Sequence, residues 1–525
     1  MVIMRRLGLH KVATSTCGVA IALLSLAVNA QQNSALPPFD LQETTIGSIR
    51  EAVATKKVSC EAIVKAYLER IERFDKSGAM PINAIITTNP SVIAQAKKID
   101  ALPATALGPL ACAPLIIKDN IDVAGLPTTS GNKSLAHNIA KEDATQVGRL
   151  VSAGALVLAK SNLAEFAWTP DYSESAVGGL TRNPYDTQRT TGGSSGGTAA
   201  AVAANFGVAG LGTDTGASIR GPSALQNLVG LRPTMGASSR DGVIPIWLSR
   251  DTVGPMARTV TDAALIFEVT AGYDPKDAVT AAAQTHPAFS ASHALRPGGL
   301  KGLRIGIFNP LVNRQGGNQQ ILQRFDQAIS DLRQQGAIVV PLDISDFHSV
   351  ADVGFPNRME YDFNQYLLGN GVLSTDLNFA KIIDKVDYLP KSASWIKAQI
   401  GVPVPQNDPK ERQDEEKTAT LRSTIVQAMD RENLALVIYP TWMQPPRLLN
   451  QLSTDGGNNN SVFADAGLPA ITVPMGDVSS GLPSGLQFGG RPFSEQLLIS
   501  AAFGYEQATH HRRAPHALPD ANVVR

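Results

Sequence analysis

Two glycine-rich clusters close together in the chain contain serines that could act as nucleophiles. Residues 191–198 combine two serines with four glycines, and the alanine-rich segment after them favours a helix. Residues 215–222 follow an apolar segment that predicts a strand, and they lead into a second helix. The first cluster could also bind phosphate at a helix N-terminus, but Thr198 stands where a nucleotide-binding loop of the P-loop type requires lysine. These clusters therefore favour serine chemistry over nucleotide binding.

Ser218 is the candidate nucleophile, because it lies in the predicted turn between a strand and a helix. Backbone N–H groups of Thr215, Gly216 and Ala217 could converge there on one oxygen and form an oxyanion hole. Alanine at 217 would be strained if the hole required a positive φ at that position. A serine at such a turn is also a common helix N-cap, so these residues alone leave both roles open.

A serine nucleophile needs a base, and none of the eight histidines lies inside either cluster. Lys118 is the natural substitute, because it ends an apolar strand and precedes Asp119 and Asn120. Burial disfavours the ammonium form and lowers the pKa, which a lysine needs in order to accept a proton near neutrality. The alternative is a lysine at a strand end that simply reaches water.

Three motifs in this order resemble the amidase signature family: residues 116–120, 192–197 and 212–220. The resemblance is strongest over residues 110–260 and implies a mixed β-sheet core flanked by helices on both faces. It implies that Lys118 is the base, that Ser194 is a relay serine, usually on a cis peptide bond, and that Ser218 is the nucleophile. The implied reaction is hydrolysis of an amide through an acyl-enzyme, without a metal or an organic cofactor.

The substrate is less well defined by the sequence. Residues 162–168 resemble a segment that lines the pocket in that family, so Ala167 and Trp168 are expected to contact the substrate. Residues 355–361 are expected to lie above them. We expect a small-molecule amide, while esters and carbamates offer a similar acyl carbon.

Two other functional classes remain as alternatives. Residues 193–197 match the short G-x-S-x-G motif, which would make Ser195 the nucleophile of an esterase of the α/β-hydrolase type. The chain could also be a non-catalytic exported binding protein, or a transamidase-like subunit that requires a partner.

The elements that must position these residues follow an α/β pattern. Helical periodicity predicts helices over 46–75, 142–153, 319–335 and 494–505, and short apolar runs predict strands at 115–117, 155–158, 303–308, 436–439 and 470–473. Asp214 and Arg220 are expected to pair and to fix the turn that carries Ser218. We expect one amidase domain over residues 31–525, in which the more polar and irregular residues 345–430 form an insertion that shapes the substrate site.

The N-terminus has the pattern of a secretory signal peptide. Arg5, Arg6 and Lys11 precede an apolar run, and small residues before Gln31 predict cleavage after Ala30. A stable membrane anchor is the less favoured interpretation, because the run is short. The mature chain is therefore expected to be periplasmic or secreted.

The amino-acid composition also limits the kinds of partner and metal site to be expected. Lysine plus arginine and aspartate plus glutamate both number 46, so neither nucleic acid nor an anionic membrane is indicated as a partner. Cys60 and Cys112 would be the only mature cysteines, and they could form one disulfide or remain two buried thiols. His510, His511 and His516 lack a companion with metal-ligand spacing, so no metal site is predicted. The sequence leaves the oligomeric state open.

Overall fold

The structure is a computed structural model that describes residues 39–525 except 79, 313–314, 452–456, 479, 517, 519–522 and 525. The predicted signal peptide, residues 1–30, lies outside the described residues. Among the helices of the described part, none is both long and apolar enough to cross a bilayer.

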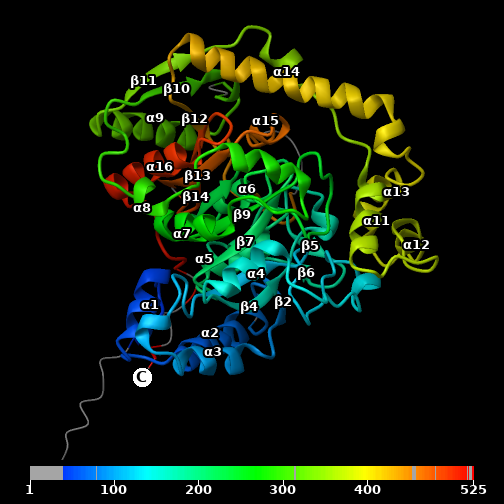
Figure 1. Cartoon of the computed structure of the whole chain (residues 1–525). Helices are drawn as coiled ribbons and strands as arrows, with labels where there is room; N and C mark the ends of the chain where they lie inside the picture. The colour runs from blue at the N-terminus through cyan, green and yellow to red at the C-terminus, as the bar shows by residue number, and fades with distance from the viewer. Residues whose placement is uncertain are drawn as a thin grey trace, which may run out of the picture. The chain divides into compact units, whose positions relative to one another are not determined.

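A mixed β-sheet forms the centre of the fold (Figure 1). Within the described residues it has 11 strands in the order β11-β10-β12-β14-β13-β8-β9-β7-β3-β4-β2. The strands are β2 (Ile85–Thr88), β3 (Pro114–Lys118), β4 (Leu156–Ser161), β7 (Ala209–Asp214), β8 (Val229–Arg232), β9 (Thr252–Ala257), β10 (Arg304–Phe308), β11 (Ile338–Leu342), β12 (Leu436–Pro440), β13 (Ala470–Asp477) and β14 (Pro483–Gly489). β3 pairs in parallel with both β4 and β7, whereas β9 runs antiparallel to β7 and β8. Each strand predicted from an apolar run is present.

Helices cover both faces of this sheet, as the resemblance implied. The short helices α5 (Gly196–Ala203) and α6 (Arg220–Ala224) contact each other and pack on one face. The other face is covered by α4 (Thr145–Ser152), α7 (Val260–Thr270), α9 (Gln319–Gln334) and α16 (Glu495–Thr509). The predicted helices over 142–153, 319–335 and 494–505 are therefore confirmed to within a few residues.

Glycines in β7 allow the N-terminus of α5 to lie directly on the sheet. A Cβ atom at Gly210 would be 2.6 Å from Thr198 Cγ2, and one at Gly212 would be 2.8 Å from Ser195 Oγ. Because real Cβ atoms do not approach other atoms so closely, a larger residue at either position would push α5 away. This close packing positions the first serine cluster beside the end of β7.

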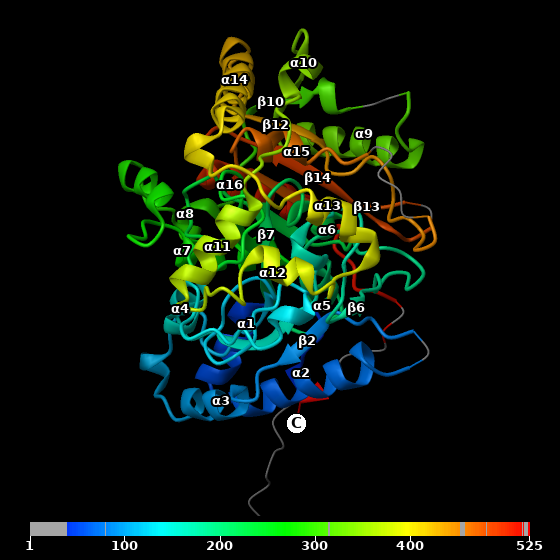
Figure 2. The same cartoon turned by 90° about the vertical axis from the view of Figure 1, so that its right-hand side faces the viewer.

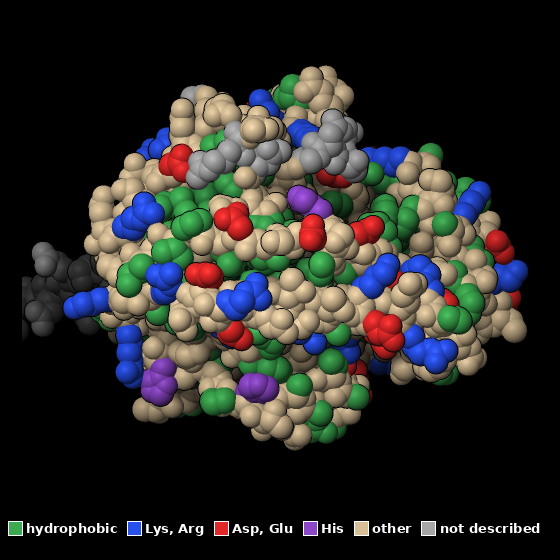
Figure 3. Space-filling model, turned by 90° about the horizontal axis from the view of Figure 1, so that it is seen from above, with side chains coloured by type: hydrophobic (Ala, Val, Ile, Leu, Met, Phe, Trp, Pro, Cys, Tyr) green, Lys and Arg blue, Asp and Glu red, His purple; other side chains and the backbone are tan. Residues whose placement is uncertain are grey.

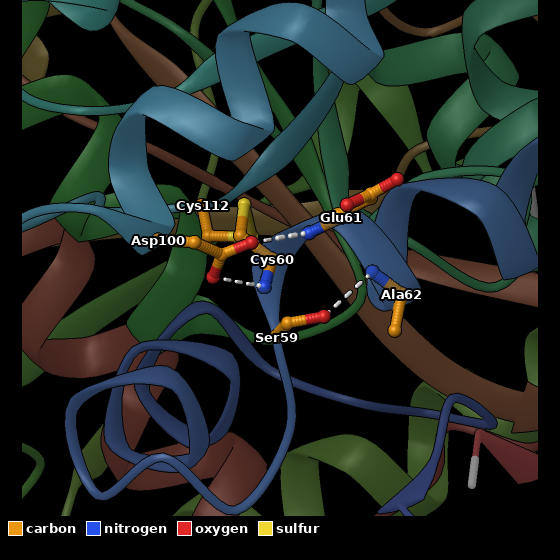
Figure 4. The surroundings of a disulfide bond; sticks show 6 residues. All are labelled: Ser59, Cys60, Glu61, Ala62, Asp100 and Cys112. Carbon is orange, nitrogen blue, oxygen red and sulfur yellow. Dashed lines mark hydrogen bonds between the residues drawn. A yellow bond between two sulfur atoms is a disulfide. The ribbon is translucent and has the colours of Figure 1, made fainter.

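The N-terminal helices α1 (Ile46–Ala54) and α2 (Cys60–Asp75) confirm the prediction for residues 46–75. α2 begins at a disulfide between Cys60 and Cys112, whose Cα atoms are 5.7 Å apart (Figure 4). The carboxylate of Asp100, the last residue of α3 (Val92–Asp100), accepts hydrogen bonds from the N–H groups of Cys60 and Glu61 at 2.7 and 3.0 Å. Of the two states that the sequence left open, the structure contains the disulfide.

Residues 345–430 are helical rather than irregular. They contain α10 (Phe347–Ala351), α11 (Met359–Gly369), α12 (Phe379–Asp384), α13 (Ala393–Lys397) and the long α14 (Pro409–Arg431). Figures 1 and 2 show α11, α12 and α13 outside the sheet, where their apolar side chains form a second buried cluster with Phe166 and Trp247 of the core. Acidic and basic side chains are mixed on the face seen in Figure 3. The expectation of an irregular segment was wrong, because α10, α12 and α13 are too short and α14 is too polar to give clear periodicity.

Candidate active site

Lys118 lies at the end of β3 and is fully buried. Its Nζ atom is 2.7 Å from Ser194 Oγ and 2.7 Å from Thr213 Oγ1. Burial lowers the pKa of Lys118 from 10.5 to about 7, although the charges of Asp251 and Asp214 oppose this shift. The alternative of a lysine that reaches water is therefore wrong, and the structure brings Lys118 and Ser194 together.

Ser194 follows a cis peptide bond from Gly193, as the resemblance implied. Its carbonyl accepts hydrogen bonds from the N–H of Ala164 at 3.0 Å and from Ser173 Oγ at 3.1 Å. A Cβ atom at position 193 would lie 2.3 Å from the carbonyl oxygen of Tyr172, so only glycine fits there. These contacts hold the Ser194 side chain toward Lys118.

Ser218 lies in the turn between β7 and α6 and lines a cavity of about 460 Å³. The carbonyl of Ser218 accepts a hydrogen bond of 3.2 Å from the N–H of Ser195, which places the two serine clusters side by side. The N-cap position of α6 belongs to Ile219, so Ser218 is not an N-cap. The structure thus places the predicted nucleophile at the cavity.

The predicted oxyanion hole consists of backbone N–H groups in the turn that contains Ser218. Within the part of the chain that the structure describes, the N–H groups of the predicted donors Thr215, Gly216 and Ala217 donate to no protein acceptor, and neither does that of Ser218. Thr215 also lines the cavity, and its hydroxyl donates to Asp251. Neither Gly216 nor Ala217 has a positive φ, so alanine at 217 introduces no backbone strain.

A buried charge network fixes this turn. Asp214 forms salt bridges with Arg220 at 3.1 Å and with Arg232 at 3.2 Å, which confirms the expected pairing with Arg220. Its carboxylate also accepts a hydrogen bond of 3.1 Å from the N–H of Ile219. Burial by itself would raise the pKa of Asp214, but the two arginines hold that pKa at about 2. Arg220 in turn donates to the carbonyl of Gly216 at 3.1 Å.

Ser195, the nucleophile of the esterase alternative, lies in a different environment. It is fully buried, its Oγ donates to the carbonyl of Thr213 at 3.2 Å, and it does not line the cavity of Ser218. None of the described histidines lines that cavity either. The arrangement offers Ser195 neither a base nor access to substrate.

The cavity has one aromatic wall and one polar wall. Ala167 and Trp168, the predicted contact residues, both line it, but of residues 355–361 only Phe355 does. On the polar wall Arg250 and Asp465 form a salt bridge of 2.8 Å, and burial raises the pKa of Asp465 to about 6. The described residues contain no group of three or more His, Cys, Asp or Glu side chains arranged to hold a metal ion.

Sequence reasoning missed Thr213 and Asp251. Thr213 reaches Lys118 because β3 and β7 are parallel neighbours. The carboxylate of Asp251 accepts hydrogen bonds from the N–H groups of Ile246 and Trp247 at 2.8 and 3.0 Å and from the Thr215 hydroxyl. Burial raises the pKa of Asp251 to about 6. Asp251 therefore links the oxyanion turn to the cavity wall.

The fold and the site together define a class: enzymes with a mixed sheet in which a buried lysine contacts one serine and a second serine lines a cavity. The family model described as Amidase matches residues 62–499, and the chain belongs to this family of amidase signature enzymes. The amidohydrolase activity implied by the resemblance is thereby supported.

Curated relatives cover nearly the whole chain. A glutamyl-tRNA(Gln) amidotransferase subunit of Symbiobacterium thermophilum is 34% identical over 502 residues, which are 88% of this chain and 96% of that protein. A probable amidase of Arabidopsis thaliana is 32% identical over 512 residues, covering 94% and 95%. Among solved structures, the native peptide amidase of Stenotrophomonas maltophilia has a TM-score of 0.82 at 34% identity and covers 91% of this chain and 99% of that chain.

Proposed function

We propose that this protein is an exported amidase that cleaves a C–N amide bond through an acyl-enzyme on Ser218. In this proposal Ser194 is the proton relay and Lys118 is the base. The main support is the buried 2.7 Å contact between Lys118 Nζ and Ser194 Oγ, together with the cavity that Ser218 lines. A lysine with a pKa of about 7 is half neutral at neutral pH and can accept a proton.

The reaction begins when Ser218 Oγ attacks the acyl carbon of the amide. Ser194 Oγ takes the proton of Ser218 while giving its own proton to neutral Lys118, because a hydroxyl both donates and accepts. The N–H groups of Thr215, Gly216 and Ala217 stabilise the oxygen that becomes negative. The proton then returns through Ser194 to the leaving nitrogen, the C–N bond breaks, and water repeats the sequence on the acyl-enzyme.

Structural similarity favours a hydrolase over a transamidase-like subunit. The peptide amidase has a TM-score of 0.82, whereas the glutamyl-tRNA(Gln) amidotransferase subunit of Thermotoga maritima has 0.70 at 25% identity. We therefore propose a linear amide as the substrate, with esters and carbamates as further compounds to be screened.

Covalent labelling tests the assignment of roles. A fluorophosphonate should label Ser218 in the wild-type protein and in the Ser195→Ala variant, and neither Ser218→Ala nor Lys118→Ala should be labelled. Labelling of Ser218→Ala at Ser195 would support the esterase alternative and refute this mechanism. A protein that is labelled but hydrolyses no amide without an added partner would support the transamidase-like alternative.

We further propose that the protein is periplasmic or secreted. The charged, apolar and small residues of segment 1–30 have the order of a signal peptide. The disulfide between Cys60 and Cys112 is consistent with an oxidising compartment. N-terminal sequencing of the exported protein should begin at Gln31, and retention of the full-length chain in the cytoplasm would contradict the proposal.

A further inference from the structure

Three aromatic side chains form one wall of the cavity that Ser218 lines. The ring centroids of Trp168 and Trp247 are 6.2 Å apart, with the rings almost perpendicular. The ring of Phe355 lies 6.3 Å from Trp168 and 5.7 Å from Trp247. Because each ring contacts the other two, they form a continuous apolar surface in the cavity that Ser218 lines.

Two of these rings are held in place from behind. Trp395 of α13 stacks on Trp168, with centroids 3.9 Å apart and an angle of 15° between the rings. Trp247 is only 4% exposed, and its backbone N–H donates to Asp251. Side chains that are already ordered lose little conformational entropy when a ligand binds, so this surface is preorganised.

Phe355 is different, because its backbone is fixed while its ring is open to solvent. The carbonyl of Gly354 accepts a hydrogen bond of 2.9 Å from Arg250, and the carbonyl of Phe355 accepts one of 2.6 Å from Lys410. The Phe355 side chain is nevertheless 67% exposed. An exposed aromatic ring that continues the wall of a cavity leaves apolar surface for a ligand to cover.

The polar wall is unsuited to an anionic group. Asp171, Asp352 and Asp465 line the cavity, and among its described lining residues Arg250 is the single cation. Arg250 already forms a salt bridge with Asp465 and donates a hydrogen bond to the carbonyl of Gly354. Among the described lining residues, a free carboxylate on the substrate would therefore meet acidic side chains and a cation that already has partners.

We propose that Trp168, Trp247 and Phe355 form a specificity subsite for an aromatic ring of an uncharged or cationic amide, an inference that rests on the hydrolysis proposed above. Aromatic rings prefer edge-to-face or offset contacts at centroid distances of about 4.5–7 Å, and this wall offers both faces and edges. The ring lies on the acyl side or on the nitrogen side of the scissile bond, and two series of substrates distinguish these positions.

The first experiment measures kcat/KM for matched amides. N-acetylphenylalanine amide, N-acetylalanine amide and N-acetylglutamate amide test the acyl side, while acetanilide and N-methylacetamide test the nitrogen side. We expect the ring-bearing amide of at least one series to be preferred about tenfold or more, with the glutamate compound poorest. Equal rates with and without a ring in both series, or a preference for the glutamate compound, would overturn the proposal.

Phe355→Ala is the decisive variant, because the side chain is exposed and its loss removes little folding energy. It should raise KM for the preferred ring-bearing amide about tenfold, with little change in kcat. For N-acetylalanine amide, KM should change by less than about twofold. Phe355→Tyr should retain the preference for a ring. Tyr273→Ala is the matched control, since Tyr273 is an aromatic residue that is 42% exposed and lies outside the cavity. An unchanged KM in Phe355→Ala, or an equal rise in Tyr273→Ala, would refute the subsite.

Fluorophosphonate labelling of each variant separates the two proposals. A protein that is labelled at Ser218 but shows no preference for a ring refutes the subsite and leaves the hydrolytic mechanism intact. A wild-type protein that is not labelled at Ser218 refutes the mechanism on which the subsite rests.

Discussion

The pH dependence of the rate is the sharpest test of Lys118 as the base. In the proposed mechanism only neutral Lys118 can accept the proton of Ser194. Burial lowers the pKa of Lys118 to about 7, so the protein should gain activity as pH rises through neutrality. Above that range nearly all Lys118 is neutral, and the rate should level off.

The structure also gives the size of this effect. With a pKa of about 7, roughly one-eleventh of Lys118 is neutral at pH 6 and roughly ten-elevenths at pH 8, so kcat/KM should rise about tenfold between them. A lysine with the ordinary pKa of 10.5 would be neutral in only about one molecule in 3,000 at pH 7. Burial therefore increases the population of the base at pH 7 by about a thousandfold.

The assay is a profile of kcat/KM from pH 5 to 10 on a neutral amide, whose own ionisation does not change over this range. Ser195→Ala is the control, because Ser195 does not line the cavity and its variant should retain the same midpoint. A rate that is flat from pH 5 to 9, or one that rises tenfold per pH unit as far as pH 10, would refute the assignment of a buried lysine base.

Four further predictions follow from the same contacts. Lys118→Met should be inactive, yet more stable than the wild type at pH 6. The lowered pKa of Lys118 reduces the free energy of unfolding by about 5 kcal/mol below pH 7, and this reduction becomes smaller as pH rises from 7 to 10.5. Urea titrations should therefore show a smaller gain in stability for the variant at pH 10. Asp214→Asn should lower the free energy of unfolding by about 3–5 kcal/mol in the same urea titration, because two buried arginines lose their counterion. An unchanged urea midpoint would contradict this prediction. Replacing Cys60 and Cys112 together by serine should lower the free energy of unfolding by up to about 4 kcal/mol, because the disulfide closes a loop of 52 residues, and it should not change kcat. A loss of kcat would show that the disulfide influences the active site. Ala217→Gly should leave kcat/KM within about twofold because φ at 217 is not positive, whereas a large gain would reveal strain at the oxyanion hole.

The candidate residues of the site could be picked out from the sequence because each stands in a recognisable local pattern, whereas their roles as base, relay and nucleophile were implied by the resemblance to the amidase signature family. Lys118 ends an apolar strand, and Ser218 stands in a glycine-containing turn between Asp214 and Arg220. Each local environment therefore follows from neighbouring residues. The strands and the longer helices were predictable for the same reason, since their periodicity is strong. The insertion was misjudged because α11, α12 and α13 are stabilised mainly by the second apolar cluster, which they form with Phe166 and Trp247, while α14 is long but mostly polar.

The sequence by itself determined the family, the class of fold and the residues that can do chemistry. Only the tertiary structure decided that Thr213 contacts Lys118, because that contact depends on the parallel pairing of β3 with β7. Likewise only the folded chain joins Cys60 to Cys112, and only it assembles Trp168, Trp247 and Phe355 into one wall. The physical reason is that periodicity and turn chemistry act over a few neighbouring residues, whereas the partners of a buried group and the walls of a cavity come from segments far apart in the chain.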